Sequence, residues 1–354
     1  MPYRTRLVEL ARRPGRAAVD NLVTIHVTSS RSRQRCDFRR LFAAHYERIR
    51  ATCLSFTEPG IAVFAFSLRD SSWQGSMCLA ARPGEVRAGV VGRHSAADLS
   101  LDSDRRGLAL RHLLYVIEPL PLRDAFRGEV RFRVMDLETG HPPRDEEGRA
   151  VASLTAEGPV FLTCSGVALL AFVTGDATDW PECAADAWDI QPERIFIDER
   201  LASGSAPRAH PFAARPVLDP LRTTIVRQAG PRHVGDLGSD DSGCGHFDLT
   251  TARGRYHLRV GSDALARGVL LGRYERCHNH AASVFLTERV SRVHLLVIDI
   301  AGKLVAIDLG SSNGTFLVDP EGGFLTPLRI GHLAAGQVLA LGSRRILLSW
   351  HPAD

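Results

Sequence analysis

Asp308-Leu309-Gly310-Ser311-Ser312-Asn313-Gly314-Thr315 is the stretch that decides the fold in the last third of this 354-residue chain. It follows an apolar run over residues 303–307, so a strand must end there in a tight loop. Gly310 and Gly314 allow backbone angles that other residues avoid. The three short polar side chains between these glycines can therefore face outward.

Two similar junctions lie upstream of this loop. Gly272-Arg273 closes the apolar run 269–271, and Ser291-Arg292-Val293-His294 opens the apolar run 295–298. Each motif is short and weak by itself. Three polar junctions in this order, each at the edge of an apolar strand, form a much more specific pattern.

With these motifs, about residues 244–351 resemble the forkhead-associated (FHA) domain, an antiparallel β-sandwich whose loops at one end bind phosphothreonine peptides. The resemblance implies that Arg273 and Ser291 contact the phosphate and that Arg292 lines the same site. It also implies that Ser312 contributes from the loop and that Asn313 grips the peptide backbone. The chemistry agrees, since arginine gives a bidentate fork to phosphate oxygens and a hydroxyl donates to them.

The resemblance also implies residues that shape the loops without touching ligand. They are Gly272, His294, Gly310, Gly314 and Thr315. His294 invites a catalytic interpretation, but the chain offers no carboxylate at a triad-like spacing to orient it as a base. We therefore expect His294 to brace its loop.

The segment between Arg273 and Ser291 is longer than is common in the family, so peptide specificity cannot be carried over. It contains Cys277, His278 and His280. Structural zinc sites usually combine two separated pairs of ligands. We therefore expect no metal there.

The upstream part of the chain repeats this pattern. Residues 86–116 run parallel to 266–298: Val90-Val91-Gly92-Arg93 matches Leu270-Leu271-Gly272-Arg273, and the six residues from Ala109 match those from Ser291. We interpret residues 59–174 as a first, diverged FHA-like sandwich. An unrelated β domain is the alternative.

The first copy differs from the second at the positions that are expected to contact phosphate. Arg93 and His112 remain, but Ala109 stands where Ser291 would be. The acidic run Asp145-Glu146-Glu147 follows the loop over residues 138–143 and would repel a phosphate if it lay at that end. We expect this copy not to bind phosphothreonine.

The chain as a whole is predicted to be all-β, with two antiparallel sandwiches. The segment 1–58 holds a strand over 22–27 and an amphipathic helix over 36–53, which we expect to pack on the first sandwich. Residues 175–243, rich in Pro, Gly and Ser, are predicted to be a linker with short elements, flexible over 202–207 and 238–243. The FHA domain follows at 244–351.

The composition indicates in which cellular compartment the protein lies and which classes of partner it is expected to bind. The net charge is +4, 44% of the residues are hydrophobic, and no apolar run is long enough to cross a bilayer. Seven cysteines without a CxxC motif, and no apolar signal segment at the N-terminus, indicate reduced thiols in the cytoplasm. The basic residues are almost all arginine, so we expect the Arg-rich N-terminal segment to be a solvated face. A nucleic-acid surface or a membrane contact is not expected.

The predicted function is a phosphothreonine-peptide-binding adaptor in bacterial Ser/Thr kinase signalling, whose partner is a phosphothreonine-containing protein or the kinase. The alternative is a phosphate-independent scaffolding protein that uses FHA-like sandwiches for assembly. No P-loop, Gly-x-Ser-x-Gly elbow or kinase motif set is present, so no enzymatic activity and no cofactor are predicted. The identity of the partner and the oligomeric state stay open.

Overall fold

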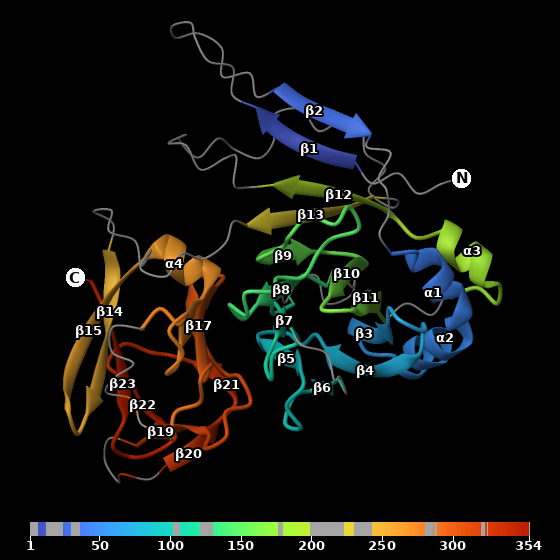
Figure 1. Ribbon diagram of the computed structural model, residues 1–354. Helices are drawn as coiled ribbons and strands as arrows, with labels where there is room; N and C mark the ends of the chain where they lie inside the picture. Colours follow the sequence, from blue (N-terminus) through green and yellow to red (C-terminus); the bar gives the residue numbers. More distant parts are fainter. Residues whose placement is uncertain are drawn as a thin grey trace, which may run out of the picture.

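The computed structural model describes residues 6–11, 24–29, 36–101, 107–120, 130–175, 180–198, 223–229, 243–279, 286, 289–319, 323 and 325–353. Two β-sandwiches lie side by side, and a layer of helices covers the far side of the first (Figure 1). The molecule is therefore mostly β, as predicted. The expected flexible stretches 202–207 and 238–242 lie outside the described residues.

The second sandwich consists of a six-stranded and a four-stranded sheet. The six-stranded sheet has the order β15 (Gly254–Gly261), β14 (Gly243–Thr251), β23 (Leu347–Pro352), β22 (Val338–Leu341), β19 (Thr315–Val318) and β20 (Leu325–Leu328). The four-stranded sheet has the order β16 (Val269–Leu271), β17 (Leu295–Ile300), β18 (Lys303–Asp308) and β21 (Ile330–His332). Helix α4 (Ser262–Arg267) connects the two sheets. The predicted strands of this half are all present.

The first sandwich has the same strand order at its centre. One sheet runs β10 (Val160–Cys164), β11 (Val167–Thr174), β3 (Gly60–Ser67), β4 (Trp73–Ala80), in the positions of β22, β23, β14 and β15. The other contains β9 (Ser153–Ala156), β8 (Phe132–Asp136), β7 (Leu113–Ile117) and β5 (Arg87–Gly92), in the positions of β21, β18, β17 and β16. A short β6 (Leu99–Ser100) ends this sheet.

Segments outside the predicted first sandwich extend that sheet to nine strands. Beyond β9 follow β13 (Thr223–Ala229), β12 (Glu193–Asp198), β1 (Arg6–Ala11) and β2 (Thr24–Ser29). β13 pairs with β9 antiparallel, whereas β12 pairs with both β13 and β1 in parallel. Part of the segment predicted to be a linker is thus built into the first sandwich, since its backbone groups join the ladder.

The predicted helix over 36–53 is present as two helices. α1 (Phe38–Ala44) ends at His45, and α2 (Tyr46–Ser55) begins directly after it. With α3 (Ala184–Asp189) they cover one face of the β3–β4–β10–β11 sheet. Aromatic side chains fill the contact, for example Phe42 with its ring centroid 5.6 Å from that of Phe172. The expected packing on the first sandwich is confirmed.

The two sandwiches meet sheet against sheet. A buried apolar cluster joins side chains of β5, β7 and β8 to side chains of β16, β17 and β18. Its central members are Val90, Leu114, Val116, Met135, Leu270, Leu296, Ile298 and Ile307. Neighbouring residues on the same strands point the other way, into the separate core of each sandwich. These strands are therefore buried on both faces, which explains their uninterrupted apolar sequences.

All seven cysteines are free thiols. Among the described residues, none of the helices is long and apolar enough to cross a membrane.

Candidate functional site

A cavity of about 460 Å³ lies where loops of both sandwiches meet. From the second sandwich it is lined by Arg273, Tyr274, Ser291, Arg292, Val293 and Ser312. From the first it is lined by Arg93, His94, Ala109, Leu110, Arg111, Leu137 and Thr139. Four of the five predicted ligand-binding residues therefore share one cavity. The contribution of the first sandwich was not predicted.

Arg273 is exposed, and its base is fixed by the neighbouring loop. Its Nε donates to the carbonyl oxygen of Val290 at 2.8 Å, and its backbone N–H donates to the carbonyl oxygen of Ser291 at 3.2 Å. Gly272 permits this close approach, because a Cβ at this position would lie 2.2 Å from the carbonyl oxygen of Arg292. The terminal guanidinium nitrogens are the part of Arg273 left to meet an anion in the cavity.

Ser291 connects two loops of the site. Its hydroxyl oxygen accepts a hydrogen bond from the backbone N–H of Ser312 at 3.0 Å. Its own backbone N–H donates to Nδ1 of His294 at 3.0 Å. The hydroxyl proton of Ser291 can still be donated to a ligand.

His294 lies in the protein interior, away from the cavity lining. Burial lowers the pKa of His294 to about 4, against a smaller opposing effect of Asp308, whose Oδ2 lies 3.9 Å from Nε2. The ring is thus neutral at neutral pH, with Nδ1 as acceptor and the proton on Nε2. This geometry is that of the predicted loop brace.

Asp308 organises the loop over residues 308–315. Its carboxylate accepts from the backbone N–H of Ser311 at 2.7 Å, from the Ser311 hydroxyl at 2.6 Å and from the Thr315 hydroxyl at 2.6 Å. Gly310 and Gly314 have positive φ angles of 74° and 77° in the same loop. The predicted shaping roles of Gly310, Gly314 and Thr315 fit this geometry. The role of Asp308 was missed, although a carboxylate preceding a turn of serines indicates side-chain-to-backbone bonding.

Asn313 lies outside the cavity lining. Its side chain is exposed, and its Nδ2 donates to the carbonyl oxygen of Arg289 at 2.9 Å. The predicted peptide-gripping role of Asn313 stays a prediction.

The loops of the first sandwich make the same hydrogen bonds at equivalent positions. The Nε of Arg93 donates to the carbonyl oxygen of Leu108, as that of Arg273 does to Val290. The N–H of Ala109 donates to Nδ1 of His112 at 3.0 Å, as that of Ser291 does to His294. Burial also lowers the pKa of His112.

Direct bonds join the two sets of loops. Arg111 of the first sandwich is buried, and its Nε donates to the carbonyl oxygen of Leu309 at 2.7 Å. It also donates to the carbonyl oxygen of Gly310. In the other direction, the guanidinium of Arg276 lies against Gly140, where an added Cβ would approach its Nη1 to 1.9 Å. The binding loop of the second sandwich is thus held in part by the first.

The acidic run of the first sandwich does not line the cavity. Asp145 is buried and accepts from Nε of Arg149 at 2.8 Å and from Nε2 of Gln228 at 3.1 Å. Glu146 is buried in a bidentate pair with Arg194 of β12. Both carboxylates therefore anchor the added strands of the nine-stranded sheet. The predicted repulsion of phosphate depended on these carboxylates lying at the cavity end of the sandwich, and neither of the two lines the cavity.

The cavity is strongly electropositive. Among the described residues that line it, four are arginines and none is acidic. Burial, with a smaller effect of Arg111, lowers the pKa of His94, which is therefore neutral at neutral pH. Such a site favours a multiply charged anion such as a phosphate monoester, which carries about −1.5 to −2 charges at neutral pH.

Side chains of the long loop after Arg273 accept hydrogen bonds from the backbone of β16 and of the residue that follows it. Nδ1 of His278 accepts from the N–H of Leu270 at 3.0 Å, and Oδ1 of Asn279 accepts from the N–H of Gly272 at 3.0 Å. Burial raises the pKa of the Cys277 thiol to about 12, so this thiol is not a ready metal ligand. His280 lies outside the described residues.

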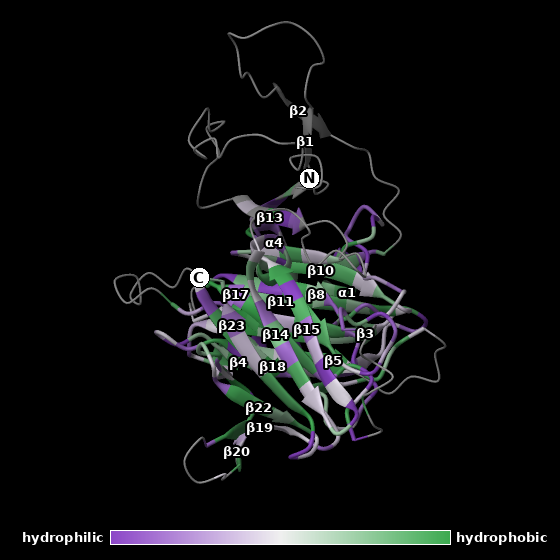
Figure 2. Ribbon diagram, turned by 90° about the vertical axis from the view of Figure 1, so that its left-hand side faces the viewer, coloured by the Kyte–Doolittle hydropathy of each residue, from purple (hydrophilic) through white to green (hydrophobic). Residues whose placement is uncertain are grey.

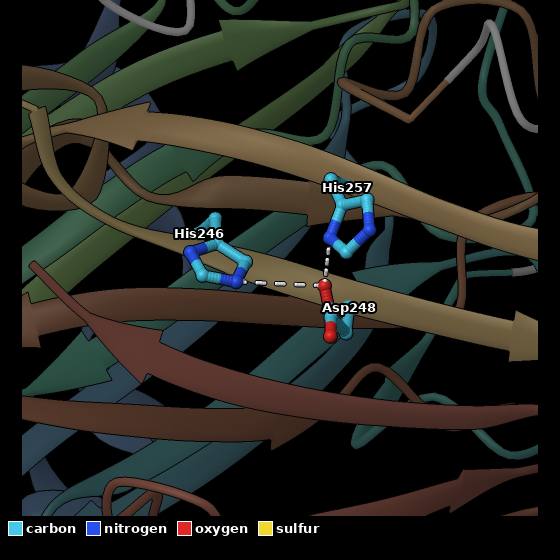
Figure 3. A group of neighbouring side chains, drawn as sticks. All are labelled: His246, Asp248 and His257. Carbon is cyan, nitrogen blue, oxygen red and sulfur yellow. Dashed lines mark ion pairs between the residues drawn. The ribbon is translucent and has the colours of Figure 1, made fainter.

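A second cluster of titratable side chains lies on the outer face of the six-stranded sheet, whose strands β14 and β15 carry mixed polar and apolar residues (Figure 2). There His246 and His257 both face the buried carboxylate of Asp248 (Figure 3). The nearest imidazole nitrogens of His246 and His257 and a carboxylate oxygen of Asp248 all lie within 4.8 Å of one another. Arg255 also pairs with Asp248 at 2.8 Å. The cluster therefore gathers two imidazoles and one guanidinium around a single buried carboxylate.

Comparison with known proteins agrees with the motifs. Residues 269–342 match the FHA domain family. Similar solved structures include an FHA domain studied for phosphothreonine-dependent interactions (24% identity, TM-score 0.22, 31% of this chain and 98% of that one). FHA-1 of Mycobacterium tuberculosis Rv1747 is another (22% identity, TM-score 0.23, 31% and 99%). A third is M. tuberculosis EmbR in complex with a low affinity phosphopeptide (19% identity, TM-score 0.22, 31% and 25%). None of the curated proteins matches significantly. The family match, together with the three polar junctions from which the cavity is built, identifies the C-terminal sandwich of this chain as an FHA domain.

Proposed function

We propose that this chain is a phosphothreonine-peptide reader that acts as an adaptor in bacterial Ser/Thr kinase signalling. The observation that carries the proposal is the convergence of Arg273, Ser291, Arg292 and Ser312 on one cavity whose described lining holds no acidic residue. The FHA family match of this sandwich supports it. The partner would be a protein carrying phosphothreonine, or the kinase itself.

The proposed contacts use the free donors of the site. The terminal nitrogens of Arg273 form charge-assisted hydrogen bonds to phosphate oxygens, and the Ser291 hydroxyl adds a third donor. Arg292 supplies further positive charge from the same wall. Asn313, at the loop tip, would hold the peptide backbone beside the phosphothreonine. We expect this site to bind and not to catalyse, because His294 is buried away from the cavity lining.

We further propose that residues 59–174 are a diverged copy of the FHA domain. The shared strand order and the repeated bonds of Arg93 and His112 support this origin. Because Ala109 has no hydroxyl, this copy should not hold a phosphothreonine by itself. A phosphate-independent scaffold is the competing function, and the sheet-to-sheet apolar contact within the chain shows one way in which such sandwiches can associate.

Calorimetric titration of the full chain tests the proposal. Matched peptides carrying phosphothreonine, phosphoserine or plain threonine are drawn from a library of sequences. We expect saturable binding of phosphothreonine peptides only, and Arg273→Ala should reduce their affinity at least tenfold, because each charge-assisted hydrogen bond contributes about 1.5–3 kcal/mol. Asn313→Ala should weaken binding less. Equal affinity for phosphorylated and plain peptides would favour the scaffold.

A further inference from the structure

The cavity contains more positive charge than one phosphothreonine requires. Arg273 and Arg292 come from the FHA domain, whereas Arg93 and Arg111 come from the first sandwich. A single phosphate carries about two negative charges at neutral pH. One such group at Arg273 and Arg292 would leave the positive charge on the opposite wall uncompensated.

Arg93 is presented to the cavity as Arg273 is. In both, Nε is bound to a carbonyl oxygen of the facing loop, which leaves the two terminal nitrogens as donors. Both side chains are exposed, and neither forms an ion pair with any residue that the structure describes. In contrast, Nε and Nη2 of Arg111 already donate hydrogen bonds to the carbonyl oxygens of Leu309 and Gly310. Among the described residues of the first sandwich that line the cavity, Arg93 is therefore the cation available to a ligand.

The surroundings of Arg93 make it a weak anion site by itself. Ala109 and Leu110 occupy the positions at which the FHA domain has Ser291 and Arg292, so a hydroxyl and a second cation are missing. Thr139 lies on the same wall, but its hydroxyl donates to Asp136 at 2.7 Å. An anion would bind at Arg93 only when the same ligand is already anchored across the cavity, since tethering raises its effective concentration.

We propose that the two sandwiches form one composite site for a doubly phosphorylated peptide segment. Its phosphothreonine binds at Arg273 and Ser291, and a second phosphorylated residue of the same segment binds at Arg93. This inference rests on the proposed function and names the ligand class of that site. It gives the first sandwich a binding role that its sequence alone argues against.

The test is calorimetry on the full chain with three peptide sets that share one phosphothreonine. The first set carries no other anion, the second carries a second phosphothreonine at varied spacing, and the third has glutamate at those positions. We expect the best doubly phosphorylated peptide to bind at least about tenfold more tightly than its singly phosphorylated parent. Glutamate should recover only part of that gain, because it carries one charge and no fork-matching phosphate oxygens.

Variants assign the gain to Arg93. Arg93→Gln should remove the gain and leave the affinity for the singly phosphorylated peptide within about threefold, whereas Arg93→Lys should retain part of it. Arg131→Gln is the matched control, because Arg131 precedes β8 at the end opposite Leu137 and pairs with Glu157. Circular dichroism checks that each variant is folded.

The outcomes separate this inference from the proposed function. If the wild-type chain binds single and double phosphopeptides equally, the composite site is wrong but the reader remains. If Arg93→Gln weakens both peptides equally, Arg93 belongs to the primary site and the inference is overturned. If no phosphopeptide binds at all, both proposals fail.

Discussion

At the scale of single residues, the FHA motifs divide into side chains that face the cavity and side chains that hold the loops. Arg273, Arg292 and Ser312 are exposed at the cavity. Asp308 and His294 are buried behind it and receive hydrogen bonds from the loop backbone or hydroxyls. The donors proposed to contact phosphate are therefore positioned before any ligand arrives, which would lower the entropic cost of binding.

The variant Asp308→Asn tests whether the hydrogen bonds that Asp308 accepts hold the loop in place. The amide places an N–H group opposite the hydroxyls of Ser311 and Thr315, so we expect the free energy of unfolding to fall by about 1–3 kcal/mol. Phosphothreonine-peptide affinity should fall as well, because the loop loses its brace. Urea denaturation and calorimetry measure the two effects. Asp299→Asn is the control, since Asp299 only accepts from Gly302 in an exposed turn; an equal effect of both variants would contradict the role.

His294 predicts a pH dependence. In the unfolded chain an ordinary histidine has a pKa near 6.5, whereas folding lowers the pKa of His294 to about 4. The unfolded state therefore binds more protons between these values, so the stability present above pH 6.5 is lost as the pH falls toward 4. The slope is about 1.4 kcal/mol per pH unit for one such group, and His112, whose pKa is also lowered, adds to it.

Denaturation midpoints measured from pH 7 to pH 4 check this prediction. His294→Asn keeps an oxygen that can accept from the N–H of Ser291 but cannot titrate, so its stability should fall less steeply with acid. A variant slope equal to that of the wild type would show that His294 is not the responsible group.

At the scale of elements, β12 and β13 lie in the segment 175–243, which its Pro-, Gly- and Ser-rich composition predicted to be a linker. They add to the edge of the first sandwich and are anchored by the buried pair between Arg194 and Glu146. The guanidinium of Arg194 also lies 4.2 Å from the ring centroid of Phe161. A buried pair of this kind adds specificity of placement more than net stability, because both charges had to leave water.

Replacing either residue of the Arg194–Glu146 pair should nevertheless lower the free energy of unfolding. Arg194→Gln or Glu146→Gln leaves an uncompensated buried charge, and we expect a loss of about 3–5 kcal/mol of unfolding free energy. The exposed pair of Arg87 and Glu85 is the control, for which Arg87→Gln should cost at most about 1 kcal/mol. A double-mutant cycle on guanidinium denaturation measures the coupling, and a coupling near zero for Arg194 and Glu146 would refute the anchoring role.

At the scale of the whole molecule, the two sandwiches form one packed body. Sheet faces from both meet in a buried apolar cluster, and the loops at one end are joined by Arg111. Asp98 of the first sandwich also pairs with Arg329 of the second at 2.6 Å. The cavity between the loops therefore has two walls of fixed relative position.

This contact predicts cooperative unfolding. The wild-type chain should unfold in a single calorimetric transition for both sandwiches, because neither can expose this apolar face without a penalty. Leu296→Asp places a charge in the contact and should split the transition in two while lowering the first midpoint. Lys303→Asp, at an exposed position on β18, is the control. A single unchanged transition for Leu296→Asp would contradict the packed arrangement.

The sequence by itself determined the FHA domain and four of the residues that line its cavity. These depend on local chemistry: glycines at turns, polar residues at strand ends, and a strand period that puts apolar residues inside. The runs 113–117 and 295–298 are apolar at every position, which by itself indicates strands buried on both faces.

Only the tertiary structure decided which surfaces those second faces meet. Leu296 shares its apolar cluster with side chains of β5, β7 and β8, which lie far from it in sequence, and no local pattern predicts that contact. The same holds for Arg93 beside Arg273 and for Glu146 beside Arg194: charged residues on distant segments acquire their roles when the sheets come together. Local sequence specifies loops and strand faces, whereas the choice among possible contacts is made by the burial of apolar area over the whole chain.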